Sequence, residues 1–271
     1  MRILIATRSI AHSDTAVRMG NIIYQMTGGT ITLLTVINDE NEKDRAESSL
    51  LQAVKVIDIP KSQIQTRIRI GQPVEEIAAE AAGYDLVIIG EPARNRFINR
   101  QRAPIAEELL AHVACPLLIT RGRPEPVRKL LFCESGHEPS LADDLTAKIP
   151  SLIKQADQVT VLHVMSQIAA GPGVAGWALR ADAETLIEEH TPEGQLLEEE
   201  VSQLEQLDIH SEAKVRHGLV IRELLDEARS GGYDLVVIGA HPGTGWERFL
   251  LGDLAREIIG QIDRPLLVMK R

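Results

Sequence analysis

The chain is poor in cysteine and in positive charge, and it contains no long apolar run. Its 271 residues include two cysteines, Cys115 and Cys133, which form no disulfide framework and stand in no metal-ligand spacing. The formal net charge of −10 argues against a nucleic-acid partner or an anionic membrane surface, because phosphate groups require a basic face. No stretch approaches the roughly 18 uninterrupted apolar residues of a membrane span. We therefore expect a soluble cytoplasmic protein with no nucleic-acid or membrane partner.

The common catalytic motifs are also missing from the sequence. The eight histidines are scattered, and no two have the i, i+4 spacing of a zinc-binding helix. There is no G-x-S-x-G elbow, no complete P-loop and no G-x-G-x-x-G fingerprint. Hydrolase, kinase-like, oxidoreductase and metal-dependent functions therefore lack their usual signals.

The most informative feature is an internal repeat. The segment YDLVIIG at residues 84–90 recurs as YDLVVIG at residues 233–239, and CPLLI at 115–119 recurs at the same offset as RPLLV at 264–268. Such self-similarity indicates two copies of one fold. Residues 121–127 (RGRPEPV) are polar and proline-rich and form the natural linker. We expect one domain over residues 1–122 and a second over residues 127–271.

Short apolar runs and amphipathic segments alternate within each copy. A serine, Ser13, is the expected N-cap of the first helix, and Pro73 suits the first position of a later one. The remaining helices are expected at 42–56 and 105–113 in the first copy, and at 140–155, 221–228 and after Gly252 in the second. The expected strands are 2–6, 31–36, 65–70, 85–90 and 116–120, then 129–133, 158–164, 213–217, 235–238 and 265–269. This alternation predicts two tandem doubly wound α/β domains, each with a five-stranded parallel sheet covered on both faces.

The second copy is longer than the first. From Val36 to Gly71 is 35 positions, whereas from Val164 to Gly218 is 54, so about 19 residues are extra, within a region we place at about 166–200. Residues 182–212 contain eleven acidic side chains and no lysine or arginine. They are expected to form a solvated helix whose apolar side packs on the sheet, or else a surface that docks a partner. The glycine-rich residues 171–177 form either a plain surface loop or a flap over the ligand crevice.

Residues 234–253 form the stretch with the clearest chemical signal. A buried strand ends at Gly239, a loop with Gly243 and Gly245 follows, and helical periodicity resumes after Gly252. Such a strand, glycine loop and helix can direct backbone N–H groups at a phosphate, although glycines also mark ordinary turns.

Two histidines lie near this predicted edge of the sheet. His241 falls in the glycine loop, where it either contacts a phosphate or serves the loop structure. His217, before the glycine that ends a strand, is expected to be a solvent-exposed turn residue rather than a catalytic base.

Both halves resemble the universal stress protein family. The resemblance lies in the first strand and serine-headed helix (ILIATRSIAHSDTAV; LLFCESGHEPSLADD), the His163-Val164 pair that ends a strand, the YDLVIIG and YDLVVIG strands, and the final proline strands (ACPLLIT; DRPLLVM). It implies the adenine nucleotide alpha hydrolase-like fold, with two copies packed as an internal pseudo-dimer through their last strands. It also implies an ATP or AMP site, formed by an acidic residue after the first strand and a G-x2-G-x9-G-(S/T) loop after the fourth.

The second half keeps part of that implied site. The acidic residue corresponds to Glu134 or Ser135, and Val164 would contact the adenine through its backbone. Pro242 and Asp253 depart from the motif, because proline lacks an N–H group and an aspartate at the start of the expected helix would cap it and repel an anion. The cofactor-site candidates are Glu134, Ser135, Val164, Gly239, His241, Gly243, Gly245, Gly252 and Asp253, and no catalytic or metal-binding residue is assigned.

The first half departs further from the motif. Arg8 stands where the family has its aspartate, and the loop after the fourth strand is basic, with arginines at Arg94, Arg96, Arg100 and Arg102. These arginines form either a cationic mouth at the carboxyl end of the sheet or an exposed loop that pairs with acidic residues.

Three hypotheses follow. The first is a tandem universal stress protein that acts as a binding module with little or no catalysis, using an adenine-nucleotide site in the second half. Its pseudo-dimer either remains a single chain or associates further into a homodimer. The second is a nucleotide-independent scaffold whose acidic segment binds an unknown protein partner. The third, an ATP-hydrolysing enzyme, is the least supported, because the glycine loop offers no general base and no magnesium-holding serine or threonine.

Overall fold

The structure, a computed structural model, describes residues 1–7, 10–91, 105–122, 124–134, 140–166, 176–240 and 246–270. The chain divides into two compact units. The first contains Met1–Pro126 and Asp263–Lys270, and the second contains Val127–Ile262. Because their relative placement is not determined, each unit is described by itself.

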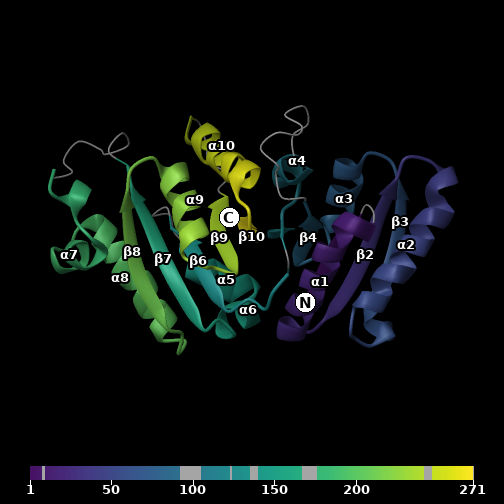
Figure 1. Cartoon of the computed structure of the whole chain (residues 1–271), viewed down its shortest axis with the longest axis horizontal. Helices are drawn as coiled ribbons and strands as arrows, with labels where there is room; N and C mark the ends of the chain where they lie inside the picture. Colours follow the sequence, from purple (N-terminus) through teal and green to yellow (C-terminus); the bar gives the residue numbers. More distant parts are fainter. Residues whose placement is uncertain are drawn as a thin grey trace. The chain divides into compact units, whose positions relative to one another are not determined.

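The first unit is built on a parallel sheet with the strand order β3-β2-β1-β4-β5. These strands are β1 (Arg2–Thr7), β2 (Thr30–Ile37), β3 (Ile64–Ile70), β4 (Leu86–Gly90) and β5 (Leu117–Thr120). The helices are α1 (Ile10–Thr27), α2 (Lys43–Val56), α3 (Pro73–Ala81) and α4 (Ile105–His112), with short 3-10 turns η1 (Glu40–Glu42) and η2 (Lys61–Gln63). Helix α1 packs with α2 and α3 packs with α4, and Figure 1 shows these helices flanking the strands.

The last strand of the second repeat, β10 (Leu266–Lys270), belongs to the first unit. It pairs antiparallel with β5, and Leu266 lies opposite Ile119. The ammonium group of Lys270 also donates a hydrogen bond to the carbonyl oxygen of Leu110 near the end of α4. The expected association of the two final strands is therefore present, and it leaves β5 with a partner on each side.

The second unit has a parallel sheet with the strand order β9-β6-β7-β8. These strands are β6 (Lys129–Cys133), β7 (Gln158–Met165), β8 (Ser211–His217) and β9 (Leu235–Ala240). Its helical segments are α5 (Leu141–Lys148), α6 (Pro150–Lys154), η3 (Ala178–Arg180), α7 (Ala183–Glu188), α8 (Pro192–Glu205), α9 (Val220–Ser230) and α10 (Trp246–Gln261). The extra residues of this repeat form η3, α7 and α8, and α8 packs on β7 and β8, as expected for the acidic helix.

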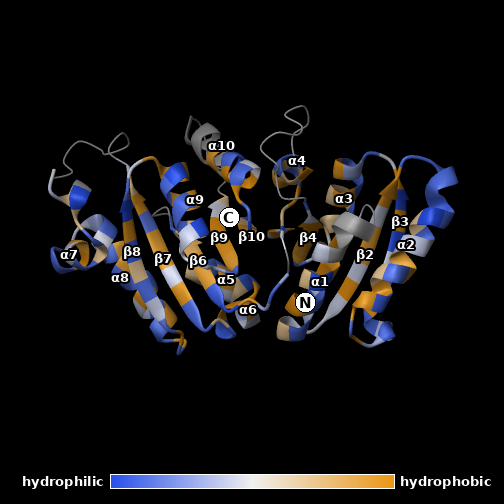
Figure 2. Ribbon diagram, viewed as in Figure 1, coloured by the Kyte–Doolittle hydropathy of each residue, from blue (hydrophilic) through white to orange (hydrophobic). Residues whose placement is uncertain are grey.

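The central strands form the core of each unit. Ile3, Leu4 and Ile5 in β1 and Leu130 and Leu131 in β6 are completely buried. Figure 2 shows the inner strands β4 and β9 mostly orange, whereas the edge strands β3 and β8 and the helices have mixed colours. Helices cover both faces of such a sheet, so its central strands are continuous apolar runs without an exposed side. The predicted doubly wound α/β class is confirmed, and within the described residues each repeat contributes five strands. No helix among those residues is both long enough and apolar enough to cross a bilayer.

Two predicted helix boundaries are wrong. Helix α1 begins at Ile10, so Ser13 lies inside the helix and is not its N-cap. The helix expected over 140–155 is two helices, because Pro150 lacks the N–H group that would continue the first one and Ile149 has a non-helical backbone. Ser140 does cap α5, with its hydroxyl accepting a hydrogen bond from the N–H group of Asp143.

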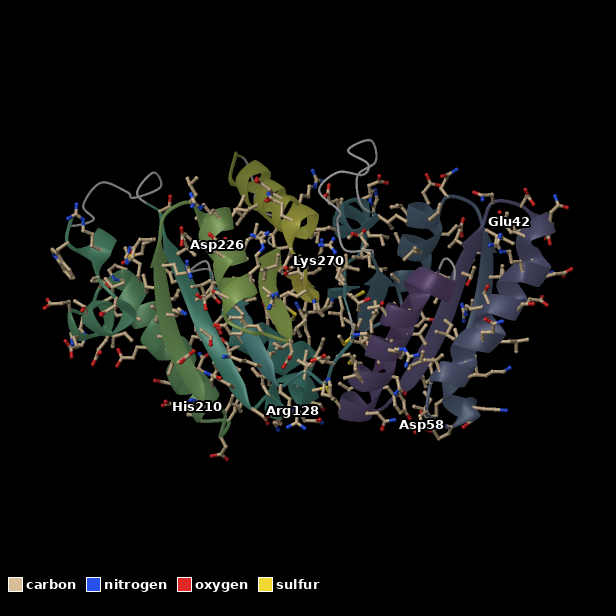
Figure 3. The ribbon with its side chains drawn as sticks, viewed as in Figure 1. Glu42, Asp58, Arg128, His210, Asp226 and Lys270 are labelled. Atoms are coloured by element: carbon tan, nitrogen blue, oxygen red, sulfur yellow. The ribbon has the colours of Figure 1, made fainter. Side chains whose placement is uncertain are left out.

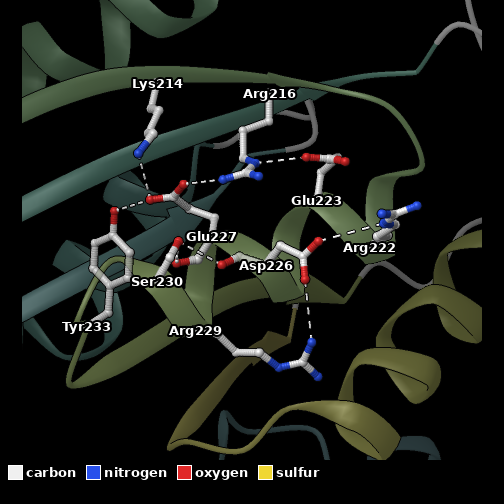
Figure 4. Close-up of polar contacts among 9 residues, drawn as sticks. All are labelled: Lys214, Arg216, Arg222, Glu223, Asp226, Glu227, Arg229, Ser230 and Tyr233. Atoms are coloured by element: carbon white, nitrogen blue, oxygen red, sulfur yellow. Dashed lines mark hydrogen bonds and ion pairs between the residues drawn. The ribbon is translucent and has the colours of Figure 1, made fainter.

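A buried glutamate joins a helix to the edge strand of the second unit (Figure 4). Glu227 of α9 is 0% exposed, and its carboxylate accepts hydrogen bonds from Lys214 (2.9 Å), Arg216 (2.9 Å) and the hydroxyl of Tyr233 (2.8 Å). Burial opposes its charge, but the bonds from Lys214, Tyr233 and Arg216 outweigh burial and lower the pKa of Glu227. This group attaches β8 to α9 on the face opposite α8.

The first unit contains the same arrangement. Glu80 of α3 is 6% exposed and binds Arg67 and Arg69 of the edge strand β3, while the hydroxyl of Tyr84 donates to it at 3.3 Å. In each unit, therefore, a buried carboxylate on a helix forms ion pairs with two partly exposed cations on the edge strand.

We expect Glu227→Gln to lower the free energy of unfolding at pH 7 by about 1–3 kcal/mol, because it removes a charged acceptor from three donors. In the folded protein the pKa of Glu227 lies below the value of 4.5 that it has in the unfolded chain. The stabilisation by the Glu227 carboxylate is therefore complete above pH 4.5 and is lost as the pH falls through the folded-state pKa. Urea unfolding followed by circular dichroism should therefore show a deficit that shrinks in acid. The exposed Glu205→Gln is the matched control, with an expected change within about 0.5 kcal/mol. A deficit that does not depend on pH would contradict this account.

Candidate functional site

The carboxyl ends of β6 and β9 form the topological switch point of the second unit. From β6 the chain proceeds outward to β7 and β8, and it then returns to place β9 on the other side of β6. Cys133 pairs with Ile238, so the next residues, Glu134 and Gly239, are neighbours at this point. Open α/β sheets bind ligands outside the carboxyl ends of their strands at such positions. The structure thus brings together two of the predicted site residues.

The N-terminus of α5 lies beside this point and is occupied by the protein's own carboxylates. The N–H group of Leu141 donates to Glu134 (3.0 Å), and that of Ala142 donates to Glu200 of α8 (3.0 Å). Glu134 is 5% exposed and Glu200 is 1% exposed. Negative charge at a helix N-terminus is favourable, because it meets unsatisfied N–H groups and the positive end of the helix dipole. The carboxylate of Glu134 is thus directed toward a helix of its own unit.

The end of β7 contributes residues to two faces of the sheet. Val164, the predicted adenine contact, is half-buried and lies opposite Arg216 of β8. His163 and Met165 lie on the other face, toward the inserted helices. Burial lowers the pKa of His163, while Glu193 and Glu134 act in the opposite direction. Burial likewise raises the pKa of the Cys133 thiol far above its ordinary range, so this thiol stays protonated.

The corresponding edge of the first unit contains a buried ion pair. Glu91 directly follows β4 and accepts hydrogen bonds from the N–H group of Ala106 at the start of α4 (2.9 Å) and from Arg121 (2.8 Å). Arg121, the first residue of the predicted linker, is 2% exposed. A carboxylate of the protein, neutralised by a buried guanidinium group, therefore occupies the N-terminus of α4.

Several predicted site residues lie outside the described residues. These are Ser135, His241, Gly243 and Gly245, together with Pro242 and the arginines Arg8, Arg94, Arg96, Arg100 and Arg102. Most of residues 171–177, the predicted loop or flap, also lie outside. Their predicted roles stay predictions.

The predicted position of Asp253 at a helix N-terminus is wrong. Helix α10 begins at Trp246, so Gly252 and Asp253 lie inside it. The intervening residues are apolar or charged and favour a helix, and a glycine in a helix interior costs only about 1 kcal/mol relative to alanine. Asp253 therefore does not cap the helix, and the predicted repulsion of an anion at its N-terminus loses its basis.

The description of His217 as a solvent-exposed turn residue is also wrong. His217 is the last residue of β8 and is half-buried, and its Nε2 atom lies 2.8 Å from the carbonyl oxygen of Ala181 in the inserted segment. Among the described residues, no cluster of three or more histidine, cysteine or acidic side chains is arranged to hold a metal ion.

The role of Glu200 was not predicted from the sequence. It lies three residues after Leu197 and four before Leu204, both completely buried, so it occupies the apolar stripe of α8. An acidic residue within an apolar stripe is a signal of a buried, hydrogen-bonded carboxylate, but only the fold shows that its partner is α5.

Comparison with known proteins identifies the family. The model of the Universal stress protein family matches the chain twice, over residues 1–121 and 142–270. The chain belongs to the universal stress protein family. The double match agrees with the internal repeat, so this family member carries two tandem copies. Among curated proteins, none matches the chain.

Solved universal stress proteins have the same fold. A universal stress protein from Archaeoglobus fulgidus DSM 4304 matches with a TM-score of 0.72 and 15% identity, covering 100% of this chain and 96% of that one. A putative universal stress protein from Pseudomonas aeruginosa UCBPP-PA14 matches with a TM-score of 0.66 and 18% identity, covering 99% and 92%. The two-copy architecture therefore occurs over nearly the whole length of both structures.

We expect Glu200→Ala to expose the start of α5 to solvent exchange, because the N–H group of Ala142 loses its buried acceptor. The expected loss of stability is about 1–2 kcal/mol, typical of a lost helix cap. Hydrogen exchange of residues 141–148 should become faster, whereas the neighbouring exposed variant Glu199→Ala should leave it unchanged. Equal exchange in the two variants would show that Glu200 does not support this helix.

Proposed function

We propose that the second unit binds an adenine nucleotide, ATP or AMP, at the carboxyl ends of β6 and β9, and that the protein acts as a binding module in a stress response. The neighbouring Glu134 and Gly239 at a switch point support this location. The first unit serves as its structural counterpart, and the localisation we propose is the cytoplasm.

The observation that carries this proposal is a difference between the repeats at one position. Glu91 follows Gly90 at the end of β4, and Ala240 follows Gly239 in β9. In the first unit that glutamate fills the N-terminus of the next helix with a carboxylate, which would repel a phosphate. Alanine brings no such charge in the second unit. This difference supports the second repeat, rather than the first, as the one that admits an anion beside the end of its fourth strand.

We propose binding without rapid turnover. Hydrolysis of ATP requires a positioned water and a group that holds magnesium beside the phosphates. The glycine loop of the second repeat, GAHPGTGWERFLLGD, has Asp253 in the place where the family motif has serine or threonine. The protein would then respond to whether a nucleotide is bound, and not to its hydrolysis.

A scaffold function is the second candidate, and the acidic surface of the insertion favours it. Eight carboxylates of the insertion and the turn that follows it are exposed, and among the described residues none of them forms an ion pair. They are Asp182, Glu184, Glu188, Glu189, Glu198, Glu199, Glu205 and Asp208. Such a surface attracts basic partners through long-range electrostatics.

Native mass spectrometry of the freshly purified protein, followed by denaturation, should release an adenine nucleotide, and calorimetry should detect binding of added ATP or AMP. Ala240→Glu should weaken this binding at least about tenfold, or about 1.4 kcal/mol, by adding the carboxylate that the first unit has. Ala240→Gln, similar in size but neutral, is the matched control and should bind more tightly than Ala240→Glu.

A protein that is empty and binds neither nucleotide would support the scaffold instead. Binding that is unaffected by Ala240→Glu would place the nucleotide at another site.

A further inference from the structure

The inserted segment of the second unit forms a small body over the ends of β7 and β8. We define this body, residues 176–194, as the cap; it contains η3, α7 and the first turn of α8. Ala178 and Leu186 of the cap pack on Met165 of β7, with Ala181 and Val215 against the same cluster. Beyond this apolar contact, the side chain of His217 bonds the carbonyl oxygen of Ala181. The cap therefore rests on a small apolar cluster and a histidine.

The cap is joined tightly within itself. The hydroxyl and the N–H group of Thr191 both donate to the carbonyl oxygen of Leu186, at 3.1 Å each. A Cβ atom on Gly194 would lie 2.0 Å from that same oxygen. Helix α7 and the first turn of α8, including Glu193, are thus held together by close backbone contact.

Two histidines lie on the face of the sheet that the cap and α8 cover. His163 is paired with Val215 and Met165 with His217. Alternate residues of a strand share a face, so all four side chains face the cap and α8. Lys214 and Arg216 point to the opposite face, where they bind Glu227.

The buried nitrogen atoms of these histidines distinguish them from ordinary surface residues. The Nδ1 atoms of His163 and His217 are both buried, and neither has a hydrogen-bond partner among the described residues. Buried polar atoms without a partner are uncommon, because each one loses its hydration without compensation. A proton added to the Nδ1 atom of His163 would place a charge where the described residues offer that atom no acceptor, although the backbone of Glu134 already bonds the same ring.

Two carboxylates act on the charge of His163. Glu134 follows β6 and already accepts a hydrogen bond from Leu141, and Glu193 lies in the cap. The neighbouring helices α8 and α5 carry Glu200, which accepts a hydrogen bond from Ala142, and Asp144, which lies 3.7 Å from Lys148. The carboxylates favour a protonated His163, but burial outweighs them and keeps the imidazole neutral.

We propose that the cap is a pH-sensitive device, closed over a neutral His163 at neutral pH and opened by mild acid. Opening hydrates the imidazole, which then takes a proton at its ordinary affinity, so acid favours the open state. Below about pH 6.5, the equilibrium between open and closed caps shifts toward the open state by up to about tenfold for each pH unit. This inference does not depend on nucleotide binding.

Hydrogen exchange measured by mass spectrometry at pH 7.5, 6.5 and 5.5 tests the proposal on the full chain. Exchange within residues 178–188, corrected for the intrinsic effect of pH, should accelerate in acid relative to α9 of the same unit. His163→Gln, which cannot take up the proton, should abolish this acceleration. His210→Gln should preserve it, because His210 is exposed at the opposite end of β8 from His217 (Figure 3).

A second variant keeps the test decisive if His163→Gln folds poorly. Gly194→Ala should force α7 and α8 apart and open the cap at every pH, giving fast exchange at pH 7.5 and little further change in acid. The proposal is overturned if the cap of the unaltered protein exchanges no faster in acid, or if folded His163→Gln keeps the full acid response.

Discussion

The edge where the parallel strands end imposes the main electrostatic constraint on this protein. Each crossover helix begins near that edge, so N–H groups and the positive ends of helix dipoles gather there and require negative charge or hydrogen-bond acceptors. The protein supplies carboxylates of its own at two described helix starts, from Glu91 in the first unit and from Glu134 and Glu200 in the second. A carboxylate in such a position competes with any external anion for the same N–H groups.

Much of the fold could be predicted because the strands are buried on both faces. Runs such as LVIIG and LVVIG are too short and too uniformly apolar for surface helices, and their recurrence revealed the two repeats. Helix starts were less predictable, because a residue type that is common at helix boundaries can also lie inside a longer helix. Ser13 and Gly252 both look like boundaries, yet α1 and α10 continue through them.

The site was only partly predictable, for a different reason. Glu134 and Gly239 follow strands that any doubly wound sheet places side by side, so their proximity follows from topology. Glu200, Arg121 and His217 acquire their roles from residues far away in the sequence. Their partners are Ala142, Glu91 and Ala181, and no spacing rule links these pairs. The insertion adds to this difficulty, because the first repeat has no counterpart for it.

The antiparallel pairing of β5 with β10 has a consequence for the order of folding. The first unit is completed by residues 266–270, so its sheet cannot be finished until the whole second repeat has been synthesised. Until then β5 presents an unpaired edge to solvent, where another extended chain could add to it. A fragment cut at the linker would keep that open edge permanently. The repeat boundary in the sequence is thus not the boundary at which the folded protein can be divided.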